Sequence, residues 1–153
     1  MKLLSVTVLI IFLAGCVSHE YVDRDNGIPD YKVKLTPQLD EFPPILHSSD
    51  YETPVPLTYP VNTAGGEDSP FITPDGRTLY VFFTPDVDVP VEEQLLDGLT
   101  GIYVTHLLNN GSWTFPTRLW LNDPGRLSLD GCAFVINNTI WFCSAREGFT
   151  GLH

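Results

Sequence analysis

The chain has few basic residues. Lysine and arginine together number 8, against 19 aspartates and glutamates, and the formal net charge is −11. A surface of this charge repels polyanions, so we do not expect the protein to bind nucleic acid. The simplest interpretation of the acidity is that it keeps the protein soluble.

Motifs of common enzyme classes are also missing. The sequence contains no Gly-x-Ser-x-Gly, no phosphate-binding glycine loop and no EF-hand. The sialidase-type Asp box, with one residue between aspartate and glycine, is absent because Asp75 and Gly76 are adjacent. The histidines are scattered along the chain and form no ligand set: His19, His47, His106 and His153. We therefore predict no cofactor and no enzymatic activity.

Long hydrophobic runs are absent except at the N-terminus. There, Lys2 precedes an apolar run at 3–13, which has the length of a signal peptide and is too short to span a bilayer comfortably. The run ends in Leu-Ala-Gly-Cys at 13–16, which resembles a lipobox, the signal of bacterial and archaeal lipoproteins. An ordinary signal peptide with an incidental cysteine and a buried apolar strand are the alternatives.

The lipobox resemblance implies a location and a partner. Residues 1–15 would be removed, and Cys16 would become the first mature residue with lipid on its sulfur. The mature chain would then be anchored to a lipid membrane through Cys16, on the extracytoplasmic side, in the periplasm or at the cell surface.

Cysteine is scarce, with three residues in the chain. If Cys16 carries lipid, Cys132 and Cys143 remain as a pair in an oxidising compartment. A two-residue turn at 137–138 would place them directly opposite each other on a hairpin, so a disulfide between them is plausible. Two buried free thiols are the alternative. A metal site is not expected because no histidine is near either cysteine in the sequence.

Helical periodicity is absent after residue 16, and the segment that follows is rich in proline. Seven of the 13 prolines fall between Pro29 and Pro60. Because proline fixes φ and lacks an N–H, this segment cannot form long helices or central strands. We predict a signal peptide at 1–15, a proline-rich tether at 16–60 and a β domain at 61–153, with at most two helical turns at 91–99.

Strand and turn signals alternate from residue 65 onward. The first four expected strands are followed by a hairpin that restarts the pattern: Thr78-Leu79-Tyr80 corresponds to Thr139-Ile140-Trp141, and Asp68 corresponds to Asp130. Repeating four-stranded units are typical of β-propeller blades. The strands are expected at 71–73, 78–83, 101–108, 113–121, 132–136 and 139–144.

The corner of the first hairpin carries the most specific motif. Pro74 presets φ for a turn, Asp75 can cap it through its side chain, and Gly76 suits a position with positive φ. The stretch at 67–80 resembles a WD40-like propeller repeat of the PD40 type, as found in the TolB family of periplasmic propellers. A lone hairpin in another β fold is the alternative. The motif residues are Ser69, Pro70, Pro74, Asp75, Gly76 and Arg77.

The resemblance implies an all-β fold of four-stranded antiparallel propeller blades. About one and a half blades are present, with one blade at 65–121 and the start of the next at 128–153. Because propellers typically have four to eight blades, we expect the sequence to be a fragment of a larger propeller, and assembly with other copies is the alternative.

Two acidic groups are candidate sites. A loop after the second strand carries several hard oxygen ligands of the kind that bind Ca²⁺, although a solvated loop is the simpler interpretation. Carboxylates just before the first strand of each blade would lie near one mouth of a propeller channel, where a pair could act as acid and base in a glycosidase. The recurrence of Asp68 and Asp130 in the repeat favours a structural role instead. The loop group is Asp86, Asp88, Glu92, Glu93 and Asp97, and the second group is Glu67, Asp68 and Asp130.

These observations predict a membrane-tethered lipoprotein whose TolB-like propeller scaffold binds a protein or glycan partner without catalysing a reaction. A carbohydrate hydrolase on a propeller fold, or a truncated fragment with no activity of its own, are the alternatives.

Overall fold

The structure is a computed structural model that describes residues 23–123 and 125–149 of the chain. The predicted signal peptide and its lipidated Cys16 lie outside these residues. The described elements are mostly strands: η1 (Arg24–Gly27), β1 (Gly66–Ile72), β2 (Thr78–Thr84), α1 (Val91–Gln94), β3 (Gly101–His106), β4 (Thr117–Arg118), β5 (Ser128–Ile136) and β6 (Thr139–Arg146). The helix predicted at 91–99 is shortened to the four residues of α1.

The first four strands form one antiparallel sheet in the order β1-β2-β3-β4. β2 is rich in aromatic and β-branched residues, as suits a strand paired on both edges. β4 is much shorter than the extended stretch predicted at 113–121. Pro116, which directly precedes β4, has no N–H to donate to the ladder, so regular pairing begins only at Thr117.

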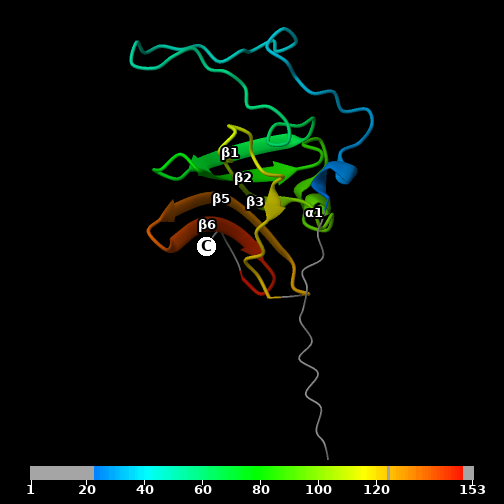
Figure 1. Cartoon of the computed structure of the whole chain (residues 1–153). Coiled ribbons are helices and arrows are strands. Elements are labelled where there is room, and N and C mark those ends of the chain that lie inside the picture. Colours follow the sequence, from blue (N-terminus) through cyan, green and yellow to red (C-terminus); the bar gives the residue numbers. More distant parts are fainter. Residues whose placement is uncertain (1–22, 124, 150–153) are drawn as a thin grey trace, which may run out of the picture.

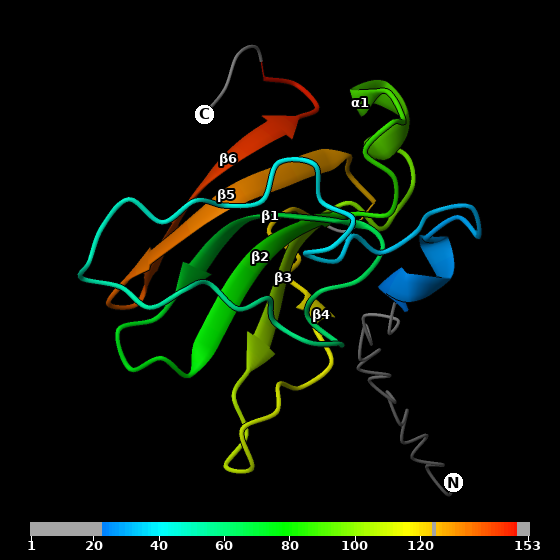
Figure 2. The same cartoon turned by 90° about the horizontal axis from the view of Figure 1, so that it is seen from above.

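β5 and β6 form a second, two-stranded antiparallel sheet. β5 lies against β1, β2 and β3, and β6 lies on the side of β5 away from the first sheet (Figures 1 and 2). The rings of Phe71 and Phe134 meet at 5.0 Å in an edge-to-face contact. The predicted all-β fold, with one four-stranded antiparallel unit followed by two strands of a second, is confirmed. The described residues form no closed barrel, and their arrangement is consistent with part of a propeller.

Each hairpin contains a β-bulge at the same place in its first strand. In the first hairpin the register shifts between Asp68 and Phe71, where Ser69 has a φ of 47°. In the second the register shifts between Gly131 and Phe134, where Cys132 has a φ of 54°. Such an extra residue bends a strand and changes which residues face each other beyond it.

The bulges correct two predictions. Cys143 pairs with Gly131, so it does not lie directly opposite Cys132 as the turn position predicted. Counted from the two bulges, Asp130 corresponds to Glu67, whereas we predicted that it corresponds to Asp68. The first error comes from the bulge, because an inserted residue shifts the register of every pair beyond it. The second error comes from the turns, since both first strands carry the bulge but Thr73 and Thr78 enclose four residues where Ile136 and Thr139 enclose two.

One side of the first sheet is covered by the N-terminal segment. The fully buried core residues Val81, Phe83 and Tyr103 pack together on this side, and Ile28 packs against them. Arg24 is also fully buried, and its guanidinium lies over the ring of Phe83 at 4.6 Å from the ring centroid. The domain therefore includes residues that precede the predicted boundary at 61.

The N-terminal segment and the β5–β6 hairpin lie on opposite sides of the first sheet (Figure 1). The alternation of side chains along β2 explains this division, because Val81 and Phe83 point to one side and Phe82 points to the other. Phe82 lies on the hairpin side, where a Cβ on Gly131 would come within 3.3 Å of its ring. The first sheet is thus packed on both faces.

Candidate functional site

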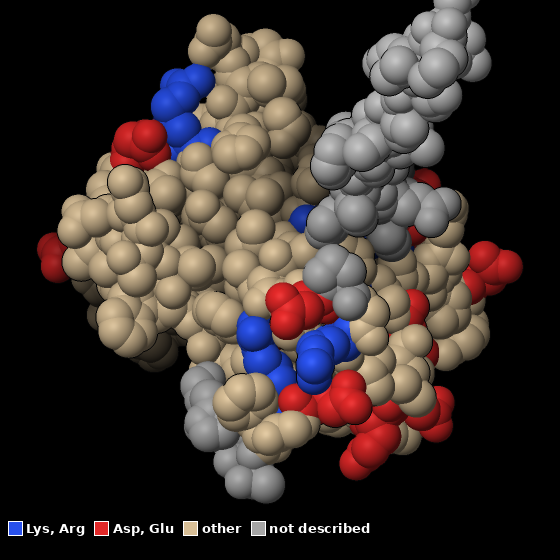
Figure 3. Space-filling model, turned by 90° about the horizontal axis from the view of Figure 1, so that it is seen from below, with Lys and Arg blue, Asp and Glu red and all other residues tan. Residues whose placement is uncertain are grey.

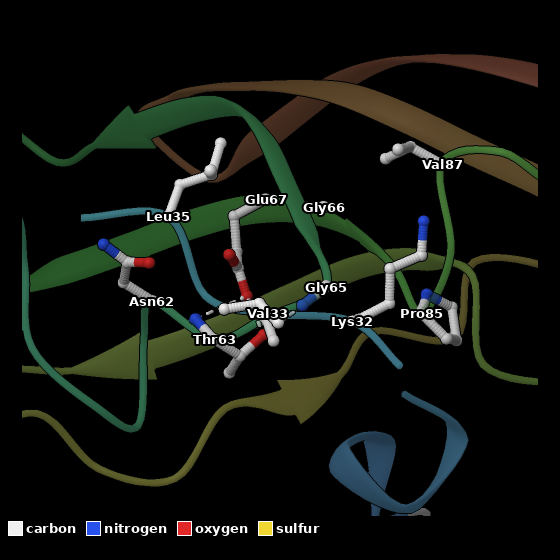
Figure 4. Close-up of a pocket in the computed structure, with 11 residues that line it drawn as sticks. Lys32, Val33, Leu35, Asn62, Thr63, Gly65, Gly66, Glu67, Pro85 and Val87 are labelled. Carbon is white, nitrogen blue, oxygen red and sulfur yellow. Dashed lines mark hydrogen bonds between the residues drawn. The ribbon is translucent and has the colours of Figure 1, made fainter. Parts of the chain in front are cut away.

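A pocket of about 390 Å³ lies where the N-terminal segment crosses the start of β1. Figure 4 shows the carboxylate of Glu67 pointing across the pocket toward Thr63. The lining combines polar side chains with short apolar ones: Lys32, Val33, Leu35, Asn62, Thr63, Ala64, Gly65, Gly66, Glu67, Pro85 and Val87.

Glu67 is held by the loop that precedes β1. Its Oε1 accepts hydrogen bonds from the hydroxyl of Thr63 at 2.5 Å and from the backbone N–H of Thr63 at 3.1 Å. The buried Arg24 places Nη1 at 3.9 Å from the same oxygen. The carboxylate is thus fixed in position by two neighbours while it lines the pocket.

Glycine is required at the rim of the pocket because other atoms approach the backbone closely. A Cβ at Gly65 would lie 2.7 Å from the ring of Phe83, and one at Gly66 would lie 2.4 Å from Cγ1 of Val87. Any larger residue would force these side chains or the backbone at the rim to shift. The two glycines therefore set the shape of the entrance.

Lys32 forms the other polar wall and is already neutralised. Its Nζ lies 2.6 Å from Oδ1 of Asp86 and 2.6 Å from Oδ2 of Asp88, and Tyr31 donates its hydroxyl to Asp86. The hydrogen bonds to the two aspartates raise the pKa of Lys32, and the bond to Asp86 has the largest effect. They lower the pKa of Asp86 to about 2, chiefly through the hydrogen bond from Lys32. The two carboxylates exceed the one ammonium by a single negative charge, so the pocket gains no spare positive charge from Lys32.

The structure separates the acidic loop residues that were grouped as a calcium candidate. Asp86 and Asp88 meet on Lys32, whereas Asp97 accepts from the backbone N–H groups of Leu99 at 2.6 Å and Thr100 at 2.7 Å. Glu92 and Glu93 lie in the first turn of α1. In the part of the chain that the structure describes, no group of three or more histidine, cysteine, aspartate or glutamate side chains could hold a metal ion. The solvated loop without a cofactor stays the prediction, with calcium binding as its alternative.

The carboxylates that precede the first strand of each unit differ in their surroundings. Glu67 lines the pocket, but Oδ1 of Asp68 accepts from the neighbouring backbone N–H of Ser69 at 2.6 Å. Asp130 is buried, and its Oδ1 accepts from the hydroxyl of Ser144 at 2.5 Å and pairs with Arg146 at 3.4 Å. Asp68 and Asp130 therefore have structural partners of their own.

The turn motif of the first hairpin also has a structural explanation. Gly76 has a φ of 69°, as expected. Oδ1 of Asp75 accepts from the hydroxyl of Thr73 at 2.6 Å and from the backbone N–H of Arg77 at 3.0 Å, and these bonds lower the pKa of Asp75. Arg77 in turn donates to the carbonyl of Leu107 at 3.2 Å. The motif thus fixes the turn to the end of β3. Ser69 and Pro70 belong to the bulge of β1.

Cys132 and Cys143 are both free and exposed, so the alternative of two buried thiols is wrong. The pKa of Cys143 is raised, first by the charge of Cys132 and then by a hydrogen bond with it. Their predicted disulfide stays a prediction.

Sequence reasoning missed the residues that build the pocket on the N-terminal side. Lys32, Asn62 and Thr63 fall in or next to the segment predicted as a tether, and they form no motif. No pattern in the sequence indicates that this segment returns to the sheet. Only the contacts of the folded chain identify them.

Comparison with known proteins adds no family, since no protein-family model, curated protein or solved structure matches the chain. Within residues 23–123 and 125–149, no helix is both long enough and apolar enough to cross a membrane.

Proposed function

We propose that the protein is an exported lipoprotein whose TolB-like propeller scaffold binds a glycan, with the sugar end held in the pocket beside Glu67. The observation that carries this proposal is the pocket itself, in which a fixed carboxylate lies among polar and short apolar side chains. The protein acts as a binding scaffold at the membrane and catalyses no reaction.

The chemistry of the lining favours an uncharged ligand with several hydroxyl groups. Glu67 and the carboxamide of Asn62 can accept hydrogen bonds from hydroxyls, while Val33 and Val87 offer apolar contact for the C–H groups of a sugar ring. An anionic ligand is disfavoured because the chain carries a net charge of −11 and Lys32 is already paired with two carboxylates.

The scaffold part of the proposal has separate support. The strand order β1-β2-β3-β4 and the matching bulges of β1 and β5 fit repeated propeller blades. The lipobox-like sequence before Cys16 supports export and attachment to a membrane. A protein partner, a carbohydrate hydrolase and a fragment without activity stay as the other predictions from the sequence.

Glycan binding is tested with the full chain purified in detergent and applied to an array of bacterial cell-surface glycans. We expect specific binding to one class of glycan, and we expect Asn62→Ala to lose most of it by removing a hydrogen-bonding group from the pocket. Asn138→Ala is the matched control, because it makes the same change in the exposed turn between β5 and β6. Absence of binding, or equal losses in the two variants, would contradict the proposal.

The membrane anchor is tested in cells. We expect the wild-type chain in the membrane fraction, with labelled fatty acid incorporated and residues 1–15 removed, and we expect Cys16→Ser to lose the label. A wild-type chain without the label would contradict the lipid anchor, and a label that persists in Cys16→Ser would place the lipid on another residue.

A further inference from the structure

A second cavity, of about 290 Å³, lies between the N-terminal segment and the first sheet. We name it the aliphatic cavity, because Leu57 and Val61 before β1 and Leu79 and Val81 of β2 form much of its wall. Val61, Leu79 and Val81 are buried, whereas Leu57 is 44% exposed. All of the walls come from residues 57–81, so the cavity does not depend on any further blade.

The backbone around the aliphatic cavity has its hydrogen-bonding groups occupied. The N–H of Val61 donates to the carbonyl of Thr58 at 3.1 Å, and the carbonyl of Val61 accepts from Arg24 at 3.2 Å. Leu79 lies in the ladders that β2 forms with β1 and β3, and Pro70, which also lines the cavity, has no N–H. A group bound here gains contact with hydrocarbon and few hydrogen bonds, which suits an aliphatic chain better than a sugar ring.

The aliphatic cavity adjoins the pocket beside Glu67. Asn62 and Glu67 line both, so these two side chains form the boundary between a polar space and an apolar one. Figure 4 shows them on one side of the polar pocket, with Lys32 and Val87 on the other. A ligand whose polar head lies beside Glu67 can therefore place an apolar group, attached directly to that head, in the aliphatic cavity.

The charges at this boundary restrict the aliphatic ligands that fit. Glu67 and Asp68 are the charged residues that line the aliphatic cavity, and both are acidic. The nearby Arg24 is shared between Glu67 and Asp25, so it does not reverse the local charge. Two carboxylates at the boundary repel the carboxylate of a free fatty acid and the phosphate of an anionic lipid. An aliphatic chain on an uncharged sugar avoids this repulsion.

We propose that the glycan bound beside Glu67 carries an aliphatic chain and that this chain occupies the aliphatic cavity, so that the ligand is an uncharged glycolipid. This inference rests on the proposed glycan binding and names the class of glycan. The proposed lipid anchor at Cys16 would hold the domain close to the membrane in which such molecules occur.

The test is calorimetric titration of the full chain in phosphatidylcholine nanodiscs, with empty nanodiscs as the blank. One series of probes is the n-alkanols from butanol to heptanol, which carry no sugar, and the other is the n-alkyl β-glucosides from methyl to hexyl. In both series we expect the affinity to rise about three- to fourfold for each added methylene until the cavity is filled. Hexanoate should bind more weakly than hexanol, because the carboxylates at the boundary repel it.

Leu57→Asn makes one wall of the aliphatic cavity polar with little change in size, and it should reduce the gain to less than about twofold for each methylene. Since all members of a series share one head group, this gain does not respond to changes in sugar binding. Leu57→Trp, which fills the cavity instead, is the second variant and should end the rise at a shorter chain. Leu108→Asn is the matched control, because Leu108 is 45% exposed and lies outside the cavity.

A further control addresses adsorption to other apolar surfaces. Figure 3, viewed from the side on which β6 lies in Figure 1, shows a broad area without charged side chains. Ile136, at the end of β5, is 52% exposed. If the chains only adsorb to such a surface, Ile136→Asn should reduce the gain for each methylene as much as Leu57→Asn does.

A gain for each methylene that Leu57→Asn reduces, and that Leu108→Asn and Ile136→Asn leave unchanged, would support the inference. No gain in the wild type, equal reduction by the controls, or hexanoate bound as tightly as hexanol would overturn it. The glycan array judges the head group separately. A gain that depends on Leu57, together with no binding on the array, would support the cavity as an aliphatic site and contradict the proposed function.

Discussion

Ser69 Oγ and Cys132 Sγ lie 3.7 Å apart, across the contact between the two sheets. Each residue occupies the bulge of the first strand of its hairpin, and each has a positive φ, 47° for Ser69 and 54° for Cys132. Two residues that are equivalent in the repeat are therefore neighbours in space. The bulges mark the point where the two units meet, at the positions where both strands bend.

Glycine at either bulge should stabilise the protein relative to alanine. The left-handed region costs a residue with a Cβ about 1–2 kcal/mol in conformational free energy, whereas glycine adopts it without this cost. We expect Ser69→Gly to unfold with a free energy about 1 kcal/mol higher than Ser69→Ala, and the pair Cys132→Gly and Cys132→Ala to differ in the same direction. Denaturant unfolding of the four variants measures this. Greater stability of the alanine variants would show that the bulges are not retained in solution.

Arg24 should be essential to the domain although it lies in the segment predicted as a tether. Its guanidinium donates to the carbonyl of Val61 at 3.2 Å and pairs with Asp25 at 3.3 Å. Arg24→Ala leaves a cavity beside Phe83 and removes the cation that pairs with the partly exposed Asp25, so we expect a loss of about 3 kcal/mol in unfolding free energy.

The control for Arg24 is Arg126→Ala, which removes an arginine with an exposed side chain and should change the stability by less than about 0.5 kcal/mol. A similar small effect of Arg24→Ala would mean that the N-terminal segment does not belong to the folded core.

The attachment of the N-terminal segment at Lys32 should weaken in acid. The pKa of Asp86 is about 2 in the folded protein, because Lys32 and then Tyr31 donate hydrogen bonds to the ionised carboxylate. In the unfolded chain an aspartate has a pKa of about 3.9. Since the folded pKa is lowered, the contribution of Asp86 to stability is complete above about pH 4 and is lost as the pH falls through about 2.

Amide hydrogen exchange of the N-terminal segment, followed from about pH 5 to about pH 2 and corrected for the intrinsic rates, measures this loss. Lys32→Met should remove most of the pH dependence. Lys34→Met is the matched control, because the Nζ of Lys34 donates to the backbone carbonyl of Asn62 at 2.7 Å and contributes no carboxylate pair. Identical profiles for wild type and Lys32→Met would refute this assignment of Asp86.

Cys143 should react faster when Cys132 is removed. The charge of Cys132 raises the pKa of Cys143, which lowers the fraction of reactive thiolate near neutral pH. We expect Cys132→Ser to increase the rate of Cys143 alkylation about two-fold or more, as measured by mass spectrometry after timed treatment with iodoacetamide under reducing conditions. An unchanged or lower rate would show that the two thiols are not close in solution.

The β architecture could be predicted because its signals are local. Aromatic and β-branched runs mark β2 and β3, and the residues Pro74, Asp75 and Gly76 specify a tight corner whatever surrounds them. The repetition of Thr-apolar-aromatic at the start of β2 and β6 was likewise visible along the chain. Proline-rich composition correctly excluded long helices and central strands from residues 29–60, all of which the structure describes.

The candidate site could not be predicted, because its residues come together only through long-range contacts. Lys32 pairs with Asp86 and Asp88, which lie 54 and 56 residues further along the sequence. Arg24 likewise reaches Glu67 only after the irregular segment returns to the sheet. Neither pairing leaves a periodic pattern.

The sequence by itself determined the strand-forming segments and their turns, since these depend on backbone preferences and on the alternation of apolar residues within each segment. Tertiary structure alone decided the register beyond each bulge, the burial of Arg24 and the assembly of the pocket around Glu67. Those features depend on packing between segments far apart in the chain, where one inserted residue or one buried charge changes every contact that follows.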